Sequence, residues 1–228
     1  MSLYVIGDTH LSFGTDKPMD IFGGWNDYTE RLKNNWQRLV TENDTVVING
    51  DISWAMTLQE ALSDFEFLNS LNGNKIIMKG NHDFWWSTKT KIEKFFKENG
   101  FDSLKILHNN AYRVDGFSVA GSRGWFFDDE ADSKVMARER DRIERSILAA
   151  KELGGETVVF LHYPPVSQTK DCEQIVEVLT RYKIKRCYYG HLHGTAAKYA
   201  FCGEKYGIDF RLCSADYLEF CPKCVYVP

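Results

Sequence analysis

The sequence predicts a layered α/β fold, and three observations lead to this prediction. Short apolar runs, rich in β-branched and aromatic residues, alternate with segments of helical periodicity along most of the chain. The runs are almost continuously apolar, which is typical of strands that are covered on both faces. Beyond Lys198 the chain alternates strand-like runs with turns and shows no helical pattern. Alternating strands and helices with a β-rich end favour helices layered on sheets.

The elements expected from these patterns are few and well separated. Strands are predicted at residues 3–6, 45–49, 75–78, 117–120, 157–161 and 187–189, and helices at 28–40, 58–71, 134–153 and 171–182. The third helix is closed by Gly154 and Gly155. Two short strands around Asn109 and Asn110 are expected to form a hairpin. Residues 11–27 lack periodicity, and a loop of this length is expected to form one wall of a site.

Composition and charge narrow the class of protein. The chain has 228 residues, of which 43% are hydrophobic and 26% charged, so we expect one globular domain over residues 1–228. No apolar run approaches the ~20 residues that a bilayer requires, and the N-terminal residues lack the pattern of a signal peptide. We therefore expect a cytoplasmic protein without a membrane partner. A net charge of −4 does not favour nucleic acid as the partner.

Residue types that bind metals follow five of the predicted strands. They are Asp8 and His10, then Asp51, then Asn81, His82 and Asp83, then His162, and finally His191 and His193. The carboxyl edge of an α/β sheet is where ligands bind, so these side chains are expected to converge. Each residue alone is better explained as a turn or capping group. Together they form a mixed nitrogen and oxygen donor set, which suits borderline divalent cations such as Mn, Fe, Co, Ni or Zn.

These blocks, in this order, resemble the calcineurin-like metallophosphoesterase superfamily. The matching motifs are Asp8-x-His10, Gly50-Asp51, Gly80-Asn81-His82-Asp83, His162 and Gly190-His191-x-His193, between residues 7 and 193. The resemblance implies a four-layer αββα sandwich, with two mixed sheets flanked by helices and a dinuclear metal centre at the strand ends. It assigns Asp8, His10, Asp51 and His193 to the first metal, and Asn81, His162 and His191 to the second, with Asp51 bridging.

The resemblance also implies a reaction, the hydrolysis of a phosphate ester. Two divalent cations would lower the pKa of a bridging water, and the resulting hydroxide would attack phosphorus. His82 would contact the phosphate and protonate the leaving group as a general acid. Asn81, His82 and Arg123 are the candidate substrate-binding residues, although a structural role for Arg123 is equally favoured. The expected substrate is a small phosphodiester, phosphomonoester or nucleotide, with Mn²⁺ supporting activity in an assay.

One position departs from the family pattern. Relatives that act on phosphoproteins carry an aspartate that orients the acid histidine, and here that position is Trp54. This disfavours a phosphoprotein substrate, and Asp83 is a candidate substitute for the missing carboxylate. The alternative to an enzyme is a catalytically silent scaffold that retains the fold. All the predicted ligands and His82 are present, so the enzyme is favoured.

The remaining features favour structural roles. Trp25, Trp54, Trp85, Trp86 and Trp125 are expected to pack loops onto the sheet rather than to stack on bases. His108 matches none of the motifs and is expected to be structural. The six cysteines are expected to be reduced thiols. A zinc site formed by Cys202, Cys213, Cys221 and Cys224 is a weaker alternative, because their spacing differs from that of zinc ribbons.

Overall fold

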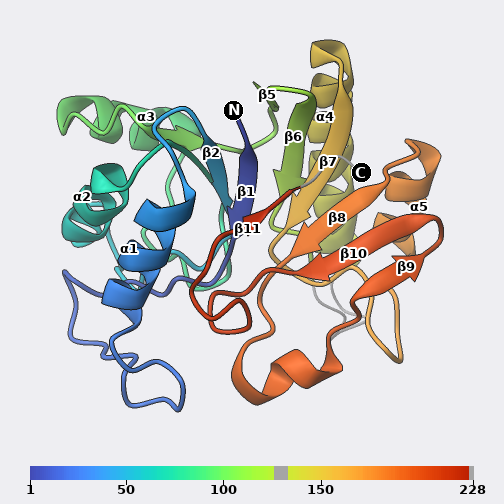
Figure 1. Cartoon of the computed structure of the whole chain (residues 1–228). Coiled ribbons are helices and arrows are strands. Elements are labelled where there is room, and N and C mark those ends of the chain that lie inside the picture. The colour runs from blue at the N-terminus through green and yellow to red at the C-terminus, as the bar shows by residue number, and fades with distance from the viewer. Residues whose placement is uncertain (126–132, 226–228) are drawn as a thin grey trace.

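A computed structural model describes residues 1–125 and 133–225, and it shows two mixed sheets packed face to face between helices (Figure 1). In spatial order, the first sheet contains β11 (Lys223–Cys224), β1 (Leu3–Ile6), β2 (Thr45–Ile48), β3 (Asn74–Ile77) and β4 (Leu104–Ile106). The second contains β5 (Tyr112–Val114), β6 (Phe117–Ser122), β7 (Glu156–Leu161), β8 (Arg186–Tyr189), β10 (Ile208–Leu212) and β9 (Gly203–Lys205). The four-layer αββα prediction is confirmed.

Successive residues along a strand contribute side chains to opposite faces of the sheet. In β2, Val46 and Ile48 belong to the core beneath the helices, whereas Val47 belongs to the core between the two sheets. Because successive side chains of a strand point to opposite faces, a continuous apolar run serves both cores. β1 to β4 are parallel, as are β6, β7, β8 and β10, so the carboxyl ends of each parallel set meet at one edge.

Helices cover the outer face of each sheet (Figure 1). The first sheet is covered by α1 (Tyr28–Leu39), α2 (Leu62–Ser70) and α3 (Lys89–Glu98). The second is covered by α4 (Ser133–Leu153) and α5 (Glu173–Arg181), and a short 3₁₀ segment, η2 (Gly194–Tyr199), follows β8. None of the helices in residues 1–125 and 133–225 has an apolar stretch long enough to cross a bilayer.

The predicted strands and helices are present, but the helices differ from the prediction in two places. The helix expected from residue 58 begins only at Leu62, after a series of turns. Helix α3 was not predicted, although the sequence contains its signals. The Thr88 hydroxyl accepts a hydrogen bond from the Lys91 backbone N–H at 3.4 Å, and Ile92 and Phe96, four residues apart, are buried on one face.

The hairpin expected at Asn109 and Asn110 is wrong. β4 and β5 lie on either side of these residues but belong to different sheets, with β4 parallel to β3 and β5 antiparallel to β6. The chain therefore crosses from the first sheet to the second at this point. The hairpin that does form joins β5 to β6 through Asp115 and Gly116, and Asp115 adopts a positive φ of 50°.

Candidate metal centre

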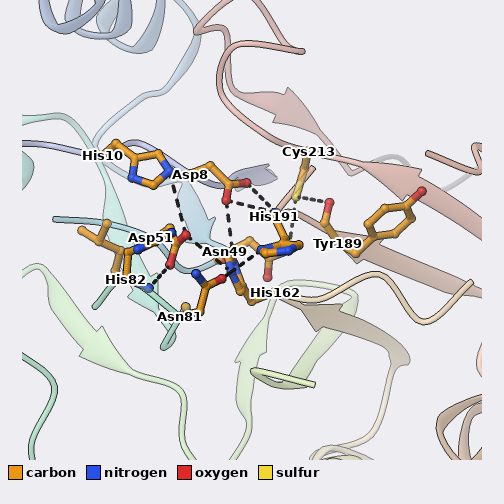
Figure 2. A network of polar contacts seen from close by, with 12 residues as sticks. Asp8, His10, Asn49, Asp51, Asn81, His82, His162, Tyr189, His191 and Cys213 are labelled. Atoms are coloured by element: carbon orange, nitrogen blue, oxygen red, sulfur yellow. Dashed lines mark hydrogen bonds and ion pairs between the residues drawn. The ribbon is translucent and has the colours of Figure 1, made fainter. Parts of the chain in front are cut away.

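Five loops from the two sheets bring polar side chains to one point (Figure 2). Asp8 and Asp51 follow β1 and β2 of the first sheet, while His162 and His191 follow β7 and β8 of the second. Asn81 follows β3. Because the carboxyl edges of both parallel sets lie at this point, residues distant in the sequence become neighbours. Convergence of the predicted ligands is therefore a consequence of the two-sheet topology.

The first cluster consists of Asp8, His10 and Asp51. Their ligand atoms all lie within 4.8 Å of one another, and each residue is at most 1% exposed. All three adopt positive φ angles, of 54°, 43° and 48° respectively. Such angles are unfavourable for residues with side chains and concentrate at functional sites. The backbone is thus bent to direct these three side chains inward.

The second cluster shares Asp51 and adds His162 and His191, again with ligand atoms within 4.8 Å of one another. The Asn81 Oδ1 atom lies 2.7 Å from His162 Nε2 and 2.9 Å from His191 Nδ1. His162 Nδ1 is 3.2 Å from the carbonyl oxygen of Asn49, to which it can only donate. Its Nε2 atom therefore carries a lone pair, which faces the oxygen of Asn81. The His162 nitrogen and the Asn81 oxygen are thus two acceptors that face each other, as expected of two ligands to one cation.

Asp51 occupies the centre of both clusters. Its Oδ2 atom lies 3.9 Å from His10 Nε2 and 3.6 Å from His162 Nε2, and Oδ1 accepts a hydrogen bond from the His82 backbone N–H at 2.7 Å. Within the described residues, Asp51 Oδ2 and both ring nitrogens of His10 are buried without a hydrogen-bond partner. Buried polar atoms left without a partner are costly. These atoms, and the mixed nitrogen and oxygen donor set, fit a pair of divalent cations.

The electrostatics of the clusters point the same way. Burial lowers the pKa of His162 and of His191 to about 3, so both rings are neutral and keep lone pairs for a cation. Burial, and then repulsion from Asp51, raises the pKa of Asp8 well above its usual value. Burial also raises the pKa of Asp51. Two carboxylates this close destabilise each other unless positive charge lies between them, which bound cations would supply.

Two glycines let the backbone pass close to the carboxylates of Asp51 and Asp8. A Cβ atom on Gly80 would lie 2.1 Å from Asp51 Oδ1 and 2.2 Å from its backbone nitrogen, and a Cβ on Gly190 would lie 2.5 Å from Asp8 Oδ2. These distances are far shorter than van der Waals contact, so only glycine fits at either position. The His191 backbone N–H also donates to both Asp8 oxygens, at 3.0 and 2.9 Å.

Asn49 is a supporting residue that the sequence analysis missed. It is fully buried, and its Nδ2 atom donates to the Leu161 carbonyl oxygen at 2.6 Å, in addition to the contact of its own carbonyl with His162. It therefore ties β2 of the first sheet to β7 of the second, just below the ligands. A polar residue that ends an apolar strand directly before Gly50 and Asp51 was the available signal.

Asp83 does not replace the missing aspartate. Its Oδ1 atom accepts hydrogen bonds from Ile52 N at 2.8 Å, Ser53 N at 3.3 Å and Trp85 Nε1 at 3.0 Å, and its Oδ2 accepts from Gly80 N at 2.7 Å. Asp83 is fully buried, and burial followed by repulsion from Asp51 raises its pKa to about 7. The carboxylate thus fastens the loop after β2 to the loop after β3.

The ring of His82 lies instead against Trp54. The centroids of the two rings are 4.6 Å apart. Trp54 also stacks on His10, with ring centroids 4.8 Å apart and an angle of 25° between the ring planes. His82 is half-buried. The predicted ligand His193 is outside both clusters in this structure, with its ring edge-on to His10 at 5.2 Å.

The loop of residues 11–27 packs against this group, as expected of a wall of the site. The Trp54 indole N–H donates to Met19 Sδ at 3.2 Å, and the Lys17 ammonium lies 5.1 Å from the indole centroid. Trp25 is 2% exposed and lies 5.9 Å from the His10 ring. As predicted, Trp25 and Trp85 are buried in the core beneath the helices, and the half-buried Trp54 and Trp86 pack against that core. Trp125 is half-buried.

The four-thiolate zinc alternative is not supported. Within the described residues, the side-chain groups close enough to hold a metal contain aspartate and histidine but no cysteine. Cys213 is fully buried, and its thiol donates to the Tyr189 carbonyl oxygen at 3.1 Å and lies 3.2 Å from Asn49 Nδ2. Cys202 is exposed. The spacing of these residues in the sequence therefore does not translate into a metal-binding group among the described residues.

The comparisons with known proteins agree with this geometry. Residues 1–195 match the calcineurin-like phosphoesterase family. The uncharacterised protein MJ1445 of Methanocaldococcus jannaschii is 27% identical over 128 residues, which is 52% of this chain and 67% of the relative. Phosphopantetheinyl hydrolase (PptH) from Mycobacterium tuberculosis has a similar fold, with a TM-score of 0.54, 14% identity, and coverage of 100% of this chain and 98% of that one.

A further solved structure with this fold is the protein of unknown function AQ665 from Aquifex aeolicus. Its TM-score is 0.53 at 15% identity, with coverage of 98% of this chain and 95% of that chain. At these identities the solved structures show the fold alone, whereas the family match extends over most of the chain. The aspartates and histidines of the two clusters belong to the motifs that resemble this family in the sequence. The chain belongs to the calcineurin-like phosphoesterase family.

Proposed function

We propose that this protein is a metal-dependent phosphohydrolase that cleaves a small phosphate ester, either a phosphodiester or a phosphomonoester. The observation that carries the proposal is the position of Asp51, whose buried Oδ2 atom lacks a hydrogen-bond partner among the described residues and lies between His10 and His162. A carboxylate shared by two groups of ligands is how proteins hold two cations ~3.5–4 Å apart. The net charge of −4 favours a small substrate over nucleic acid.

The chain offers ligands for two cations of the Mn, Fe, Co, Ni or Zn type. Asp8, His10 and Asp51 would hold the first with His193, and Asp51, Asn81, His162 and His191 would hold the second. When bound, such a pair neutralises phosphate oxygens and lowers the pKa of a water that can attack phosphorus. The neutral His162 and His191 rings can bind cations without first losing a proton.

His82 is the proposed general acid. Its backbone N–H donates to Asp51, and its half-buried ring packs against Trp54. An alkoxide is a poor leaving group, so a proton delivered to the leaving oxygen contributes typically ~10²–10⁴ in rate.

The test is hydrolysis of bis-p-nitrophenyl phosphate by purified protein with Mn²⁺, alongside the variant Asp51→Asn. We expect the wild type to turn over and the variant to lose at least about 10²-fold in kcat/KM, because the shared ligand is removed. Manganese content is measured on the same samples. Circular dichroism of the variant shows that the loss is not one of folding.

Two controls sharpen the result. Asp102→Asn alters an exposed aspartate remote from the clusters and is expected to leave turnover unchanged. p-Nitrophenyl phosphate and alkyl phosphodiesters are assayed next, to separate monoesterase from diesterase activity. If the wild type binds manganese but hydrolyses none of these esters, the phosphohydrolase proposal fails and a silent scaffold is the better description.

A further inference from the structure

A cavity lined by basic side chains lies beside the candidate metal centre. Its volume is about 110 Å³, well above the ~30 Å³ that one water occupies in the liquid, so it has room for a tetrahedral oxyanion. Its polar lining includes Lys79, His108, Arg123, Glu139 and Arg142. Three of these five side chains are cationic at neutral pH and one is a carboxylate. The cavity is thus distinct in charge from the acidic chain as a whole.

The carboxylate of the cavity is already engaged. Glu139 is 1% exposed, its Oε1 forms an ion pair with Arg142, and its Oε2 accepts a hydrogen bond from the Ser122 hydroxyl at 2.7 Å. In residues 1–125 and 133–225, the side chains of Lys79 and Arg123 form no ion pair. Within the part of the chain that the structure describes, the cavity therefore keeps positive charge that its own acid does not neutralise. Such charge, partly withdrawn from water, favours an anionic ligand.

The fold holds the two cations, Lys79 and Arg123, in place. Lys79 follows β3 of the first sheet and Arg123 follows β6 of the second, so the cavity lies where the carboxyl edges of the sheets meet. The Arg123 guanidinium lies 5.1 Å from the centroid of Trp125 and 6.0 Å from that of Tyr163. Packing on aromatic rings orients a guanidinium while leaving its N–H groups free to donate to an oxyanion.

The cavity adjoins the second metal-ligand cluster. The Arg123 carbonyl oxygen accepts hydrogen bonds from the backbone N–H groups of His162, at 3.1 Å, and Tyr163, at 2.9 Å. Lys79 lies two residues before Asn81, which itself contacts His162. Lys79 is therefore on the loop that presents Asn81, and Arg123 is hydrogen-bonded to the loop that presents His162. An anion held in the cavity would be a near neighbour of a phosphate at the metal centre.

We propose that this cavity binds a second phosphoryl group of the substrate, one that is recognised but not cleaved. The inference rests on the proposed hydrolysis at the metal centre and specifies its substrate as a compound with two phosphoryl groups. The Arg123 guanidinium would donate in bidentate fashion to this group, and the Lys79 ammonium would add a point charge. Substrates that lack the second group would bind more weakly, because this positive charge then stays unpaired.

The first experiment measures the site without turnover, by titrating manganese-loaded protein with inorganic sulfate in a calorimeter. Sulfate has the shape and charge of a phosphoryl group and no leaving group. We expect Lys79→Gln and Arg123→Gln each to weaken binding of one sulfate per chain by about tenfold or more, since each removes a charge-assisted interaction. The control Lys151→Gln removes an exposed lysine near the end of α4 and should bind as the wild type does.

The second experiment compares two substrates that differ in one phosphate, the p-nitrophenyl ester of thymidine 5′-phosphate with and without a 3′-phosphate. The wild type should favour the bisphosphate by about tenfold or more in kcat/KM, and both cavity variants should reduce this preference while Lys151→Gln keeps it. Arg123→Lys should retain part of it, because the charge remains. Equal kcat/KM values for the two substrates, or sulfate binding that the cavity variants leave unchanged, overturn the proposal.

These experiments separate the two proposals. If the wild type hydrolyses neither ester, the proposed function fails. Sulfate binding then tests the cavity without any turnover. Loss of sulfate binding in Lys79→Gln but not in Lys151→Gln supports an anion site in the cavity, and unchanged binding in both variants excludes one. Circular dichroism of each variant distinguishes a local loss of binding from unfolding.

Discussion

The indole of Trp54 lies 4.6 Å from the imidazole of His82 and 4.8 Å from that of His10. Trp54 occupies the position at which phosphoprotein-phosphatase relatives carry an aspartate that orients the acid histidine. Its own orientation is fixed by Met19, which accepts a hydrogen bond from its indole N–H, and by the backbone bond from Trp54 N to Leu11 O at 3.0 Å. In this protein the ring of His82 packs against an aromatic side chain, whereas in those relatives the histidine forms a hydrogen bond to a carboxylate.

Because Trp54 packs on the proposed general acid His82, we expect Trp54→Ala to lower kcat about 10-fold to 100-fold, part of what a general acid contributes. The loss should be much larger for an alkyl phosphodiester than for a p-nitrophenyl ester, whose leaving group needs little protonation. His82→Ala should show the same dependence on leaving group, and Trp54→Phe should retain most activity. An equal loss on both kinds of ester would contradict the role.

Gly80→Ala should weaken manganese binding by about tenfold or more, because a Cβ there would meet the backbone and carboxylate of Asp51 at 2.1–2.2 Å. The measurement is a calorimetric titration with Mn²⁺. Gly116→Ala is the matched control, since a Cβ at Gly116 meets nothing within 4 Å. Equal manganese affinities for both variants would show that the loop after β3 can move away from Asp51 at no cost.

Asp83→Asn should destabilise the fold by about 1–3 kcal/mol, because the amide can no longer accept at both ends. Its NH₂ group would face either the Gly80 N–H or the three donors at Oδ1. Urea unfolding monitored by circular dichroism measures the difference. Asp102→Asn, at an exposed position, should stay within about 0.5 kcal/mol of the wild type. A similar small change in Asp83→Asn would mean that the two loops hold together without the carboxylate.

Lys75 should make stability rise in mild alkali. This lysine is fully buried, its Nζ donates to the carbonyl oxygens of Leu71 and Gly73 and to the Ser103 hydroxyl, and burial lowers its pKa from 10.5 to about 8. Above pH 8 the folded protein loses this proton while the unfolded chain keeps it to about pH 10.5, so stability increases with pH over this window.

The size of this effect follows from the two pKa values. Between pH 7 and pH 9.5 the wild type should gain about 2 kcal/mol of unfolding free energy relative to Lys75→Met, in which the titrating group is absent. Urea unfolding of both proteins at the two pH values provides the comparison, and groups common to both cancel. A difference that does not change with pH would show that Lys75 keeps its ordinary pKa in the fold.

Much of the fold and of the candidate site could be predicted from the sequence because both depend on local patterns. Apolar runs such as that of β2 bury residues on both faces, which distinguishes a strand inside a layered fold from an exposed one. Ligand-type residues such as Asp8 and Asp51 directly follow these strands, and parallel strands bring their carboxyl ends to one edge. The convergence of the loops within each sheet is therefore already implicit in the order of the motifs.

Other features depend on contacts between segments that no local pattern specifies. β4 and β5 are short and close in sequence, yet the fold assigns them to different sheets, because long-range partners decide which edge each strand joins. The cysteines that suggested a zinc site form no ligand group among the described residues. Their sequence spacing could not show this, since the grouping of side chains depends on how strands and loops pack.

The layered α/β class, the ligand-type residues and the tryptophan in place of a carboxylate at position 54 all follow from the amino-acid sequence. The packing of Trp54 on His82, the joining of two loops by Asp83 and the cavity shared by Lys79 and Arg123 depend on the tertiary structure. The physical reason is that periodicity encodes whether a side chain is buried, whereas its neighbours are set by how separate layers pack. The charge balance of the cavity arises at the join between the two sheets.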